Sequence, residues 1–144
     1  MFFYIGFILL IVACSQNNNT TSQNASKSSN DSIEVFNDFL IKFKADSIFQ
    51  KSRIIFPLLN VTYNPYDGTS EISFVKKNQY IYNNFYWDSS YAKRERDAIT
   101  QKIKVLEDTA WIYFLGVDNG INGQLVFVCN NGKWFYFKSI DHSD

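Results

Sequence analysis

Residues 109–140 read TAWIYFLGVDNGINGQLVFVCNNGKWFYFKSI, and this stretch decides the fold of the chain. It contains three apolar runs rich in β-branched and aromatic residues, which favour strands. Residues 118–120 (DNG) separate the first two runs, and residues 130–132 (NNG) separate the last two. Asn-Gly pairs readily take the positive φ angles of a type I′ turn, so the stretch predicts consecutive antiparallel strands. We expect these strands at 109–117, 123–129 and 133–140.

The strand signals upstream of this stretch are weaker. Residues 71–75 alternate between polar and apolar side chains, and apolar residues between 99 and 106 favour another strand. Residues 78–91 are dense in Tyr, Asn and Trp and have no clear period. Pro57 cannot donate a hydrogen bond to a sheet, so residues 54–59 are predicted to form an edge strand or an extended segment.

Two helices are predicted before the strands. An apolar stripe recurs at three- and four-residue steps through Ile33, Phe36, Phe39, Leu40 and Phe43. Asp31 with Glu34, and then Ser47 with Gln50, have capping-box spacing, so a short second helix is expected over 47–53. Helices followed by strands predict an α+β fold, with two N-terminal helices packed on a curved antiparallel sheet.

Composition excludes several classes of function. Basic and acidic residues number 14 each, so the chain lacks the excess basic charge that nucleic-acid binding needs. The sequence contains no HExxH or CxxC pair, phosphate-binding glycine loop or nucleophile elbow. We therefore predict no catalytic residue, no metal ligand and no cofactor. Aromatic residues form 18% of the chain, which is enough for one core.

The N-terminus has the features of a lipoprotein signal. Residues 2–13 form an apolar run that is too short to cross a bilayer and suits a signal peptide. Residues 11–14 (IVAC) match the lipoprotein cleavage box, which predicts removal of residues 1–13 and a lipid on Cys14. No Lys or Arg precedes the run, so a short uncleaved anchor and an ordinary secretory signal remain alternatives. Ser15, in place of Asp, resembles the sorting signal of outer-membrane lipoproteins.

The segment after Cys14 predicts a flexible tether. Residues 15–32 (SQNNNTTSQNASKSSNDS) are almost all polar and uncharged, and nothing in them offsets the entropy of ordering. Such a coil spans about 25 Å, so the lipidated Cys14 and the linker over 14–32 would hold a domain over 33–141 close to a membrane. An adhesive tail is the alternative. With Cys14 lipidated, Cys129 has no partner for an intramolecular disulfide and is interpreted as a small core residue.

Two motifs suggest a family. The first, over residues 36–58, contains Phe36-x-x-Phe39, Asp46-Ser47-x-Phe49-Gln50 and Arg53-Ile54-x-Phe56-Pro57-Leu58. The second is the Asn131-Gly132-Lys133-Trp134 ending. Together they resemble an uncharacterised family of bacterial envelope lipoproteins with a nuclear transport factor 2-like (NTF2-like, cystatin-like) fold. The resemblance covers about residues 33–141 and implies a cone, in which helices wrap a bent sheet around a pocket. It implies no particular activity, because this fold hosts many functions.

Four residues are candidates for that pocket. Asp46 and Arg53 lie seven positions apart around the second predicted helix, and both belong to the first motif. They could form a buried ion pair or an anion site at the pocket mouth, or they could be a structural cap and a structural salt bridge. Trp87 and Tyr82 belong to the aromatic stretch, which could stack on a sugar or an apolar ligand, or pack a core or a partner. His142 follows the last predicted strand, which argues against a histidine base.

Three functions fit these expectations. The first is a lipid-anchored, non-catalytic module of the cell envelope, at the outer membrane, that binds a small ligand or an envelope protein. The second is a small enzyme of the hydrolase or isomerase type that uses the cone pocket. The third is a structural subunit of an envelope assembly, for which the resemblance implies a homodimer through the sheet face.

Overall fold

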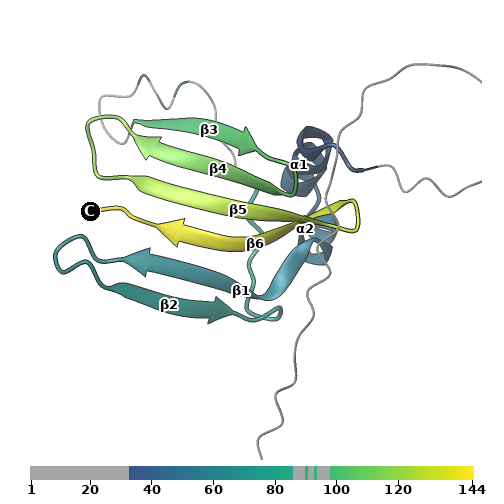
Figure 1. Ribbon diagram of the computed structural model, residues 1–144, viewed down its shortest axis with the longest axis horizontal. Helices are drawn as coiled ribbons and strands as arrows, with labels where there is room; N and C mark the ends of the chain where they lie inside the picture. The colour runs from purple at the N-terminus through teal and green to yellow at the C-terminus, as the bar shows by residue number, and fades with distance from the viewer. Residues whose placement is uncertain (1–32, 86–89, 91–92, 94–97) are drawn as a thin grey trace, which may run out of the picture.

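Two short helices lie at one end of a twisted sheet in the computed structural model, which describes residues 33–85, 90, 93 and 98–144 (Figure 1). Helix α1 (Phe36–Ala45) is followed at once by α2 (Ser47–Ser52). The strands are β1 (Ile54–Tyr63), β2 (Ser70–Val75), β3 (Ile99–Val105), β4 (Thr109–Gly116), β5 (Asn122–Asn130) and β6 (Lys133–Asp141). The α+β class is confirmed. The predicted signal, Cys14, the linker and Trp87 lie outside the described residues.

The sheet order is β2-β1-β6-β5-β4-β3. Every neighbouring pair is antiparallel except β1 and β6, which run parallel. The expectation of a wholly antiparallel sheet therefore needs one correction. Strand β1 starts directly after α2, and β6 starts after the β5–β6 turn at the same end of the sheet (Figure 1). Both strands consequently run away from the helices, so they can only pair in parallel.

The β5–β6 turn is the one that the sequence predicts. Asn131 has a φ of 49° and Gly132 a φ of 72°, and Asn130 pairs with Lys133 on either side. Two consecutive positive φ angles define a type I′ turn, which matches the right-handed twist of the strands. This turn fixes the register of the hairpin and so determines which side chains of β5 and β6 share a face.

Strand β1 is not the edge strand that Pro57 predicts. It lies between β2 and β6, and β2 is the edge. The peptide bond before Pro57 is cis, and the register of β1 against β6 is interrupted between Ile54 and Leu59. Pairing with β2 begins only at Leu58. The proline therefore falls in the unpaired part of the strand, where no backbone donor is needed.

The core forms between α1 and one face of the sheet. Phe36, Phe39 and Phe43 are buried, as the apolar stripe predicts. The ring of Phe43 meets Phe127 edge-on at 5.5 Å, and the ring of Phe36 meets Trp134 in the same way at 5.0 Å. Such edge-to-face pairs add to the free energy gained from burying the rings. The half-buried Cys129 packs against this cluster.

The N-terminal cap of α1 differs from the prediction. Ile33 and Glu34 precede the helix, and Val35 occupies the cap position without a side-chain hydrogen bond. Ile33 is exposed, so it does not extend the buried stripe. The capping-box role of Glu34 is wrong because its carboxylate accepts hydrogen bonds from Arg53 and from the backbone of Trp134 instead.

The cap of α2 is also shifted by one residue. The Asp46 carboxylate, and not the Ser47 hydroxyl, accepts hydrogen bonds from the backbone N–H groups of Ile48 and Phe49, both at 2.9 Å. Gln50 turns inward and is completely buried. Its amide nitrogen donates to the carbonyl of Phe43 at 2.9 Å. Tertiary contacts on Gln50 therefore override the local capping box that the spacing predicts.

Candidate binding surfaces

The register of the strands divides the side chains between two faces of the sheet. The inner face packs on α1 through core residues such as Leu58, Leu125 and Phe127. Because neighbouring residues of a strand point to opposite sides, the residues between them lie on the outer face. Apolar and aromatic side chains dominate this outer face: Ile72 and Phe74 from β2, Leu59, Val61 and Tyr63 from β1, Ile140 from β6, Val126 and Val128 from β5, and Trp111, Tyr113 and Leu115 from β4.

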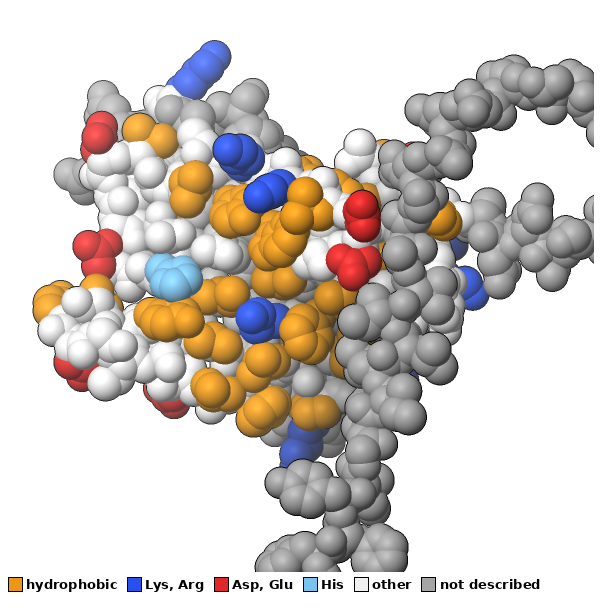
Figure 2. Space-filling model, in the orientation of Figure 1, with side chains coloured by type: hydrophobic (Ala, Val, Ile, Leu, Met, Phe, Trp, Pro, Cys, Tyr) orange, Lys and Arg blue, Asp and Glu red, His pale blue; other side chains and the backbone are white. Residues whose placement is uncertain are grey.

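The outer face is open to solvent at its β2 edge. Phe74 is 60% exposed and Ile72 is 58% exposed. Figure 2 shows apolar side chains gathered over the middle of this face. Lysines border the patch at Lys102 and Lys104 on β3, and Lys138 lies among the apolar residues of β1 and β5. A contiguous exposed apolar patch that is bordered by charge is typical of a protein-interaction surface.

The inner face of the sheet changes from apolar to polar beyond the part that the helices contact. Along β1 and β6, the inward positions that follow the core become polar at Asn60 and Ser139. The Ser139 hydroxyl donates a hydrogen bond to the Asn60 side-chain oxygen at 2.5 Å. Gln101 lies on β3. Its buried side-chain nitrogen has no hydrogen-bond partner among the described residues. Burial raises the pKa of the Tyr136 hydroxyl, which lies where the aromatic half meets this polar half.

These polar residues were missed in the candidate set from the sequence. The signal was present in the sequence, since Asn60 and Ser139 are polar residues that each follow an apolar run, at 54–59 and 134–137. Such a signal has meaning only when the two strands are known to be neighbours, and the pairing of Asn60 with Ser139 joins positions that are 79 residues apart. The polar half of the inner face can donate and accept hydrogen bonds, as a ligand-binding cone requires.

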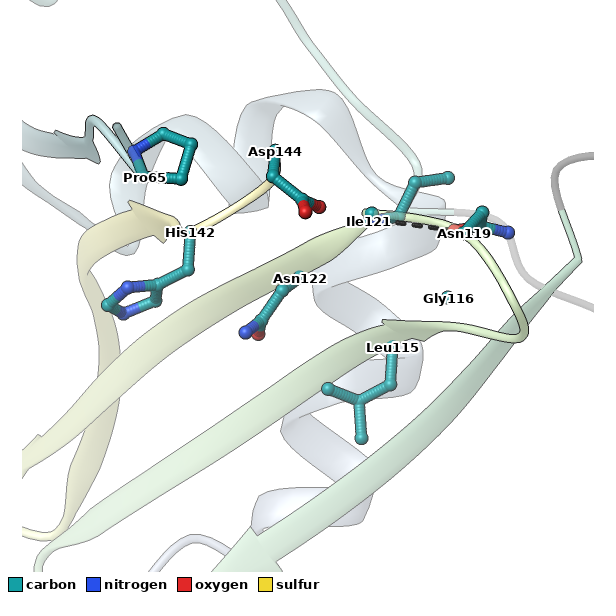
Figure 3. A pocket seen from close by; sticks show the side chains of 9 residues that line it. Pro65, Leu115, Gly116, Asn119, Ile121, Asn122, His142 and Asp144 are labelled. Atoms are coloured by element: carbon teal, nitrogen blue, oxygen red, sulfur yellow. Dashed lines mark hydrogen bonds between the residues drawn. The ribbon is translucent and has the colours of Figure 1, made fainter. Parts of the chain in front are cut away.

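A pocket lies at the end of the sheet that is far from the helices (Figure 3). Its volume is about 430 Å³, and its lining includes His142, Asp144, Asn119, Asn122, Pro65 and Leu115. The His142 ring stacks on Tyr63 at 4.2 Å, and the His142 backbone N–H donates to the carbonyl of Asn122 at 2.8 Å. Imidazole, carboxylate and amide groups here can hydrogen-bond a small polar ligand. The pocket is separate from the space between helices and sheet, where the enzyme hypothesis places its site.

Gly120 allows a close approach of Asp144 at one wall of this pocket. A Cβ at Gly120 would collide with the carboxylate of Asp144, whose backbone N–H donates to the Gly120 carbonyl at 3.1 Å. The Asn119 side-chain oxygen accepts from the backbone N–H of Ile121 at 3.1 Å, which is the dashed line in Figure 3. These contacts hold the β4–β5 turn against the end of the chain and thereby shape the pocket.

The structure describes three of the four residues that the sequence proposed for one pocket. Asp46 caps α2 by accepting hydrogen bonds from two backbone N–H groups of the helix. The Arg53 guanidinium forms an ion pair with Glu34 at 3.0 Å and donates to the carbonyl of Trp134 at 3.1 Å. Tyr82 donates its hydroxyl proton to the carbonyl of Lys44 and lines a hollow beside α2. Trp87 lies outside the described residues.

The Glu34–Arg53 pair ties the start of the fold to its last hairpin. Both side chains are mostly buried, at 24% and 14% exposure, and the Glu34 carboxylate also accepts from the Trp134 backbone N–H at 2.9 Å. We expect Glu34→Ala and Arg53→Ala each to lower the free energy of unfolding by about 2 kcal/mol, since each leaves a mostly buried charge without its ion-pair partner. The double variant should lose less than the sum of the two, because the pair is already broken.

Urea denaturation of the wild type, the two single variants and the double variant measures this double-mutant cycle. Glu71→Ala is the matched control, because Glu71 lies exposed on the edge strand β2, and it should change stability by less than about 0.5 kcal/mol. Strict additivity of Glu34→Ala and Arg53→Ala would contradict a direct interaction between the two side chains.

The fold and its faces define the class of this chain, which is that of NTF2-like and cystatin-like α+β proteins. It resembles an NTF2-like protein from Bacteroides fragilis NCTC 9343 at 23% identity and a TM-score of 0.53, over 85% of this chain and 51% of that protein. It resembles a cystatin-like protein from Bacteroides caccae ATCC 43185 at 23% identity and a TM-score of 0.50, over 76% of each chain. This chain therefore spans about half the length of the Bacteroides fragilis protein.

A family model matches residues 34–142, which is most of the chain. The chain belongs to this uncharacterised NTF2-like family, and the resemblance read from residues 36–58 and from the Asn131–Trp134 ending is confirmed for the fold. No curated protein sequence matches the chain.

The described residues also bear on membrane-spanning helices and on metal binding. No helix in that part of the chain is long and apolar enough to span a membrane. No group of three or more His, Cys, Asp or Glu side chains within it could hold a metal ion.

Proposed function

We propose that this protein is a lipid-anchored, non-catalytic module of the cell envelope that binds protein through the outer face of its sheet. The observation that carries the proposal is the exposed apolar patch on that face, centred on Ile72, Phe74, Val61 and Ile140. Helix α1 packs on the opposite face at one end of the sheet, so the core of the domain forms on that side and not on the outer face. Burial of such a patch releases about 25 cal/mol per Å² of apolar surface, which favours association.

The occupant we favour is a second copy of the chain. A two-fold interface brings the same patch together with itself, and an apolar patch is complementary to itself without matching charges. Among the described residues, Lys138 is the one charge at the middle of the patch, and its ammonium group can reach the edge of such an interface along its flexible stem. The alternative partner is another envelope protein with an apolar surface.

The anchor determines where this binding takes place. The cleavage box at residues 11–14 and the polar tract that follows support attachment to a membrane through Cys14. Ser15 supports the outer membrane as the site. Copies tethered to one membrane are concentrated near each other, which favours a weak interface between them.

Site-specific photocrosslinking in cells tests the proposal. A photoreactive phenylalanine analogue placed at Phe74, on the outer face, is expected to yield an adduct of twice the chain mass. The control places the same analogue at Tyr66, which is 92% exposed in the β1–β2 turn and away from the patch. Combining the Phe74 probe with Ile72→Lys should abolish the adduct, since a charge then replaces an apolar contact.

Three outcomes separate the occupants. An adduct of twice the chain mass from Phe74 alone supports the second copy. An adduct of one other defined mass from Phe74, lost with Ile72→Lys, supports a protein partner and rejects the homodimer. Equal adducts from Phe74 and Tyr66, or none from either, would reject the outer face as a binding surface.

A further inference from the structure

A second surface feature lies on the helix side of the molecule, where a hollow of about 460 Å³ opens beside α2. Its lining comes from two segments: Ser47, Ile48, Lys51 and Ser52 of α2, and Lys77, Tyr80 and Tyr82 of the segment that follows β2. This volume is in the range of small-molecule sites. The outer-face patch does not include any of these residues.

Hydrogen bonds to the buried Gln50 fix the position of the wall of the hollow. The Tyr80 hydroxyl donates to the side-chain oxygen of the buried Gln50 at 2.8 Å, and the backbone N–H of Asn83 donates to the same oxygen at 3.2 Å. Gln50 in turn donates to the carbonyl of Asn83 at 2.7 Å. Partial burial raises the pKa of Tyr80 to about 12, which extends the pH range over which its hydroxyl can donate to Gln50. The hollow is thus preformed, which lowers the entropy cost of binding.

The electrostatic character of the hollow is positive. Lys51 and Lys77 line it, and no Asp or Glu among the described residues does. Within the described part of the chain, neither ammonium group forms an ion pair with a carboxylate. The nearby Asp46 carboxylate accepts two backbone hydrogen bonds as the cap of α2. Two lysines without a carboxylate partner, with the Ser47 hydroxyl beside them, match the oxygens of a phosphate.

The rest of the lining is apolar or aromatic. Ile48 is 82% exposed at the rim, and the rings of Tyr80 and Tyr82 form part of the wall. A bare inorganic ion would leave these surfaces unused, whereas a phosphate ester carries its charge on a carbon body that can contact them. Aromatic and isoleucine side chains suit the glycerol or sugar part of such a molecule.

The position of the hollow is suited to a membrane headgroup. The chain enters the fold at Glu34, whose backbone N–H donates to the Gly132 carbonyl at 2.9 Å in the β5–β6 turn. This turn and α2 lie at the same end of the sheet (Figure 1). If the domain is tethered through its N-terminus, as proposed above, the hollow lies at the tethered end.

We propose that the hollow beside α2 is a binding site for a phosphate ester, with Lys51 and Lys77 holding the phosphate and Tyr80, Tyr82 and Ile48 contacting its carbon body. Two sources supply this chemistry: the headgroup of an anionic phospholipid and a soluble sugar or glycerol phosphate. The site does not depend on the outer-face patch, and it does not require Cys14 to be lipidated.

Lysine footprinting on the full chain tests the proposal and separates the sources. The protein is mixed with phosphatidylcholine vesicles, with vesicles that also contain phosphatidylglycerol, or with neutral vesicles plus glycerol 3-phosphate, and amines are then acetylated. Acetylation of Lys51 and Lys77 should slow about tenfold when the ligand exceeds its Kd about tenfold. Lys102 and Lys104 on β3 are internal controls, since they lie on the opposite face of the sheet.

Protection with phosphatidylglycerol alone assigns the site to a lipid headgroup, and protection with glycerol 3-phosphate assigns it to a soluble ester. Equal protection of all four lysines, or no protection in either arm, overturns the proposal. Calorimetry with the protecting ligand adds a second measurement: Lys51→Gln/Lys77→Gln should abolish detectable binding, and Lys102→Gln/Lys104→Gln, with the same change of charge, should not. The acetylation of Lys51 and Lys77 reports on the hollow beside α2, whereas crosslinking at Phe74 reports on the outer face. A failure of the phosphate-ester proposal can therefore be distinguished from a failure of the proposed function.

Discussion

Phe127→Ala is expected to lower the free energy of unfolding by about 4 kcal/mol, which is close to the whole stability of many small domains. Phe127 is completely buried. Its ring contacts three phenylalanines of α1, with centroid distances of 5.4 Å to Phe36, 5.8 Å to Phe39 and 5.5 Å to Phe43. Truncation therefore removes the surface on which α1 packs and leaves a cavity that the sheet cannot close.

Thermal and urea denaturation of the variant measure this effect. The matched control is Phe74→Ala, the same truncation at a side chain that is 60% exposed, and it should cost less than about 1 kcal/mol. Comparable losses for Phe127→Ala and Phe74→Ala would show that the helix–sheet cluster is not the main source of stability.

The second large effect concerns the anchor. Metabolic labelling with an alkyne fatty acid should mark the wild-type protein, and Cys14→Ala should lose the label completely. The reason is chemical, because the thiol of Cys14 is the only group in the cleavage box that can carry the diacylglycerol. Two or three acyl chains hold a protein firmly on a bilayer, so a labelled Cys14 would support the membrane anchoring proposed above.

The chain provides its own control for this experiment. Cys129 is the only other cysteine and lies in β5, so Cys129→Ala should keep the full label. Mass spectrometry of the wild-type N-terminal peptide should show a lipid-modified Cys14 as the first residue. An unlabelled wild type would support an ordinary secretory signal or an uncleaved anchor, and the membrane part of the proposed function would then be withdrawn.

The sequence predicts elements with strong local signals and misplaces those that depend on distant contacts. The turn at Asn131 and Gly132 and the buried stripe of α1 are both confirmed, because dihedral preference and helical periodicity act over a few residues. Glu34 was predicted as a helix cap and is an ion-pair partner of Arg53. Its bond to the Trp134 backbone spans 100 residues, and no local pattern encodes a contact of that separation.

The candidate site shows the same division. Tyr82 was chosen for its aromatic neighbourhood, and it lines the hollow beside α2. Lys51 and Lys77, which give that hollow its charge, were not singled out. Lys51 is on a short helix and Lys77 comes 26 positions later in the sequence. Nothing in the sequence indicates that they are neighbours, because they come together only when the chain folds back past α2. The hydrogen bonds of Tyr80 and Asn83 to the buried Gln50 hold that segment beside α2, and Gln50 itself was predicted only as part of a capping box with Ser47.

Sequence alone determined the α+β class, the β5–β6 hairpin, the buried face of α1 and the expectation of a lipid at Cys14. These follow from short-range chemistry: φ preferences, side-chain periodicity and the residues around one cleavage position. The tertiary structure decided that β1 lies inside the sheet beside β6, that Phe74 and Ile72 face solvent on a common surface, and that Lys51 and Lys77 share one hollow. The physical reason is that burial and charge proximity are properties of pairs of segments, and the pairing is set only when the core closes.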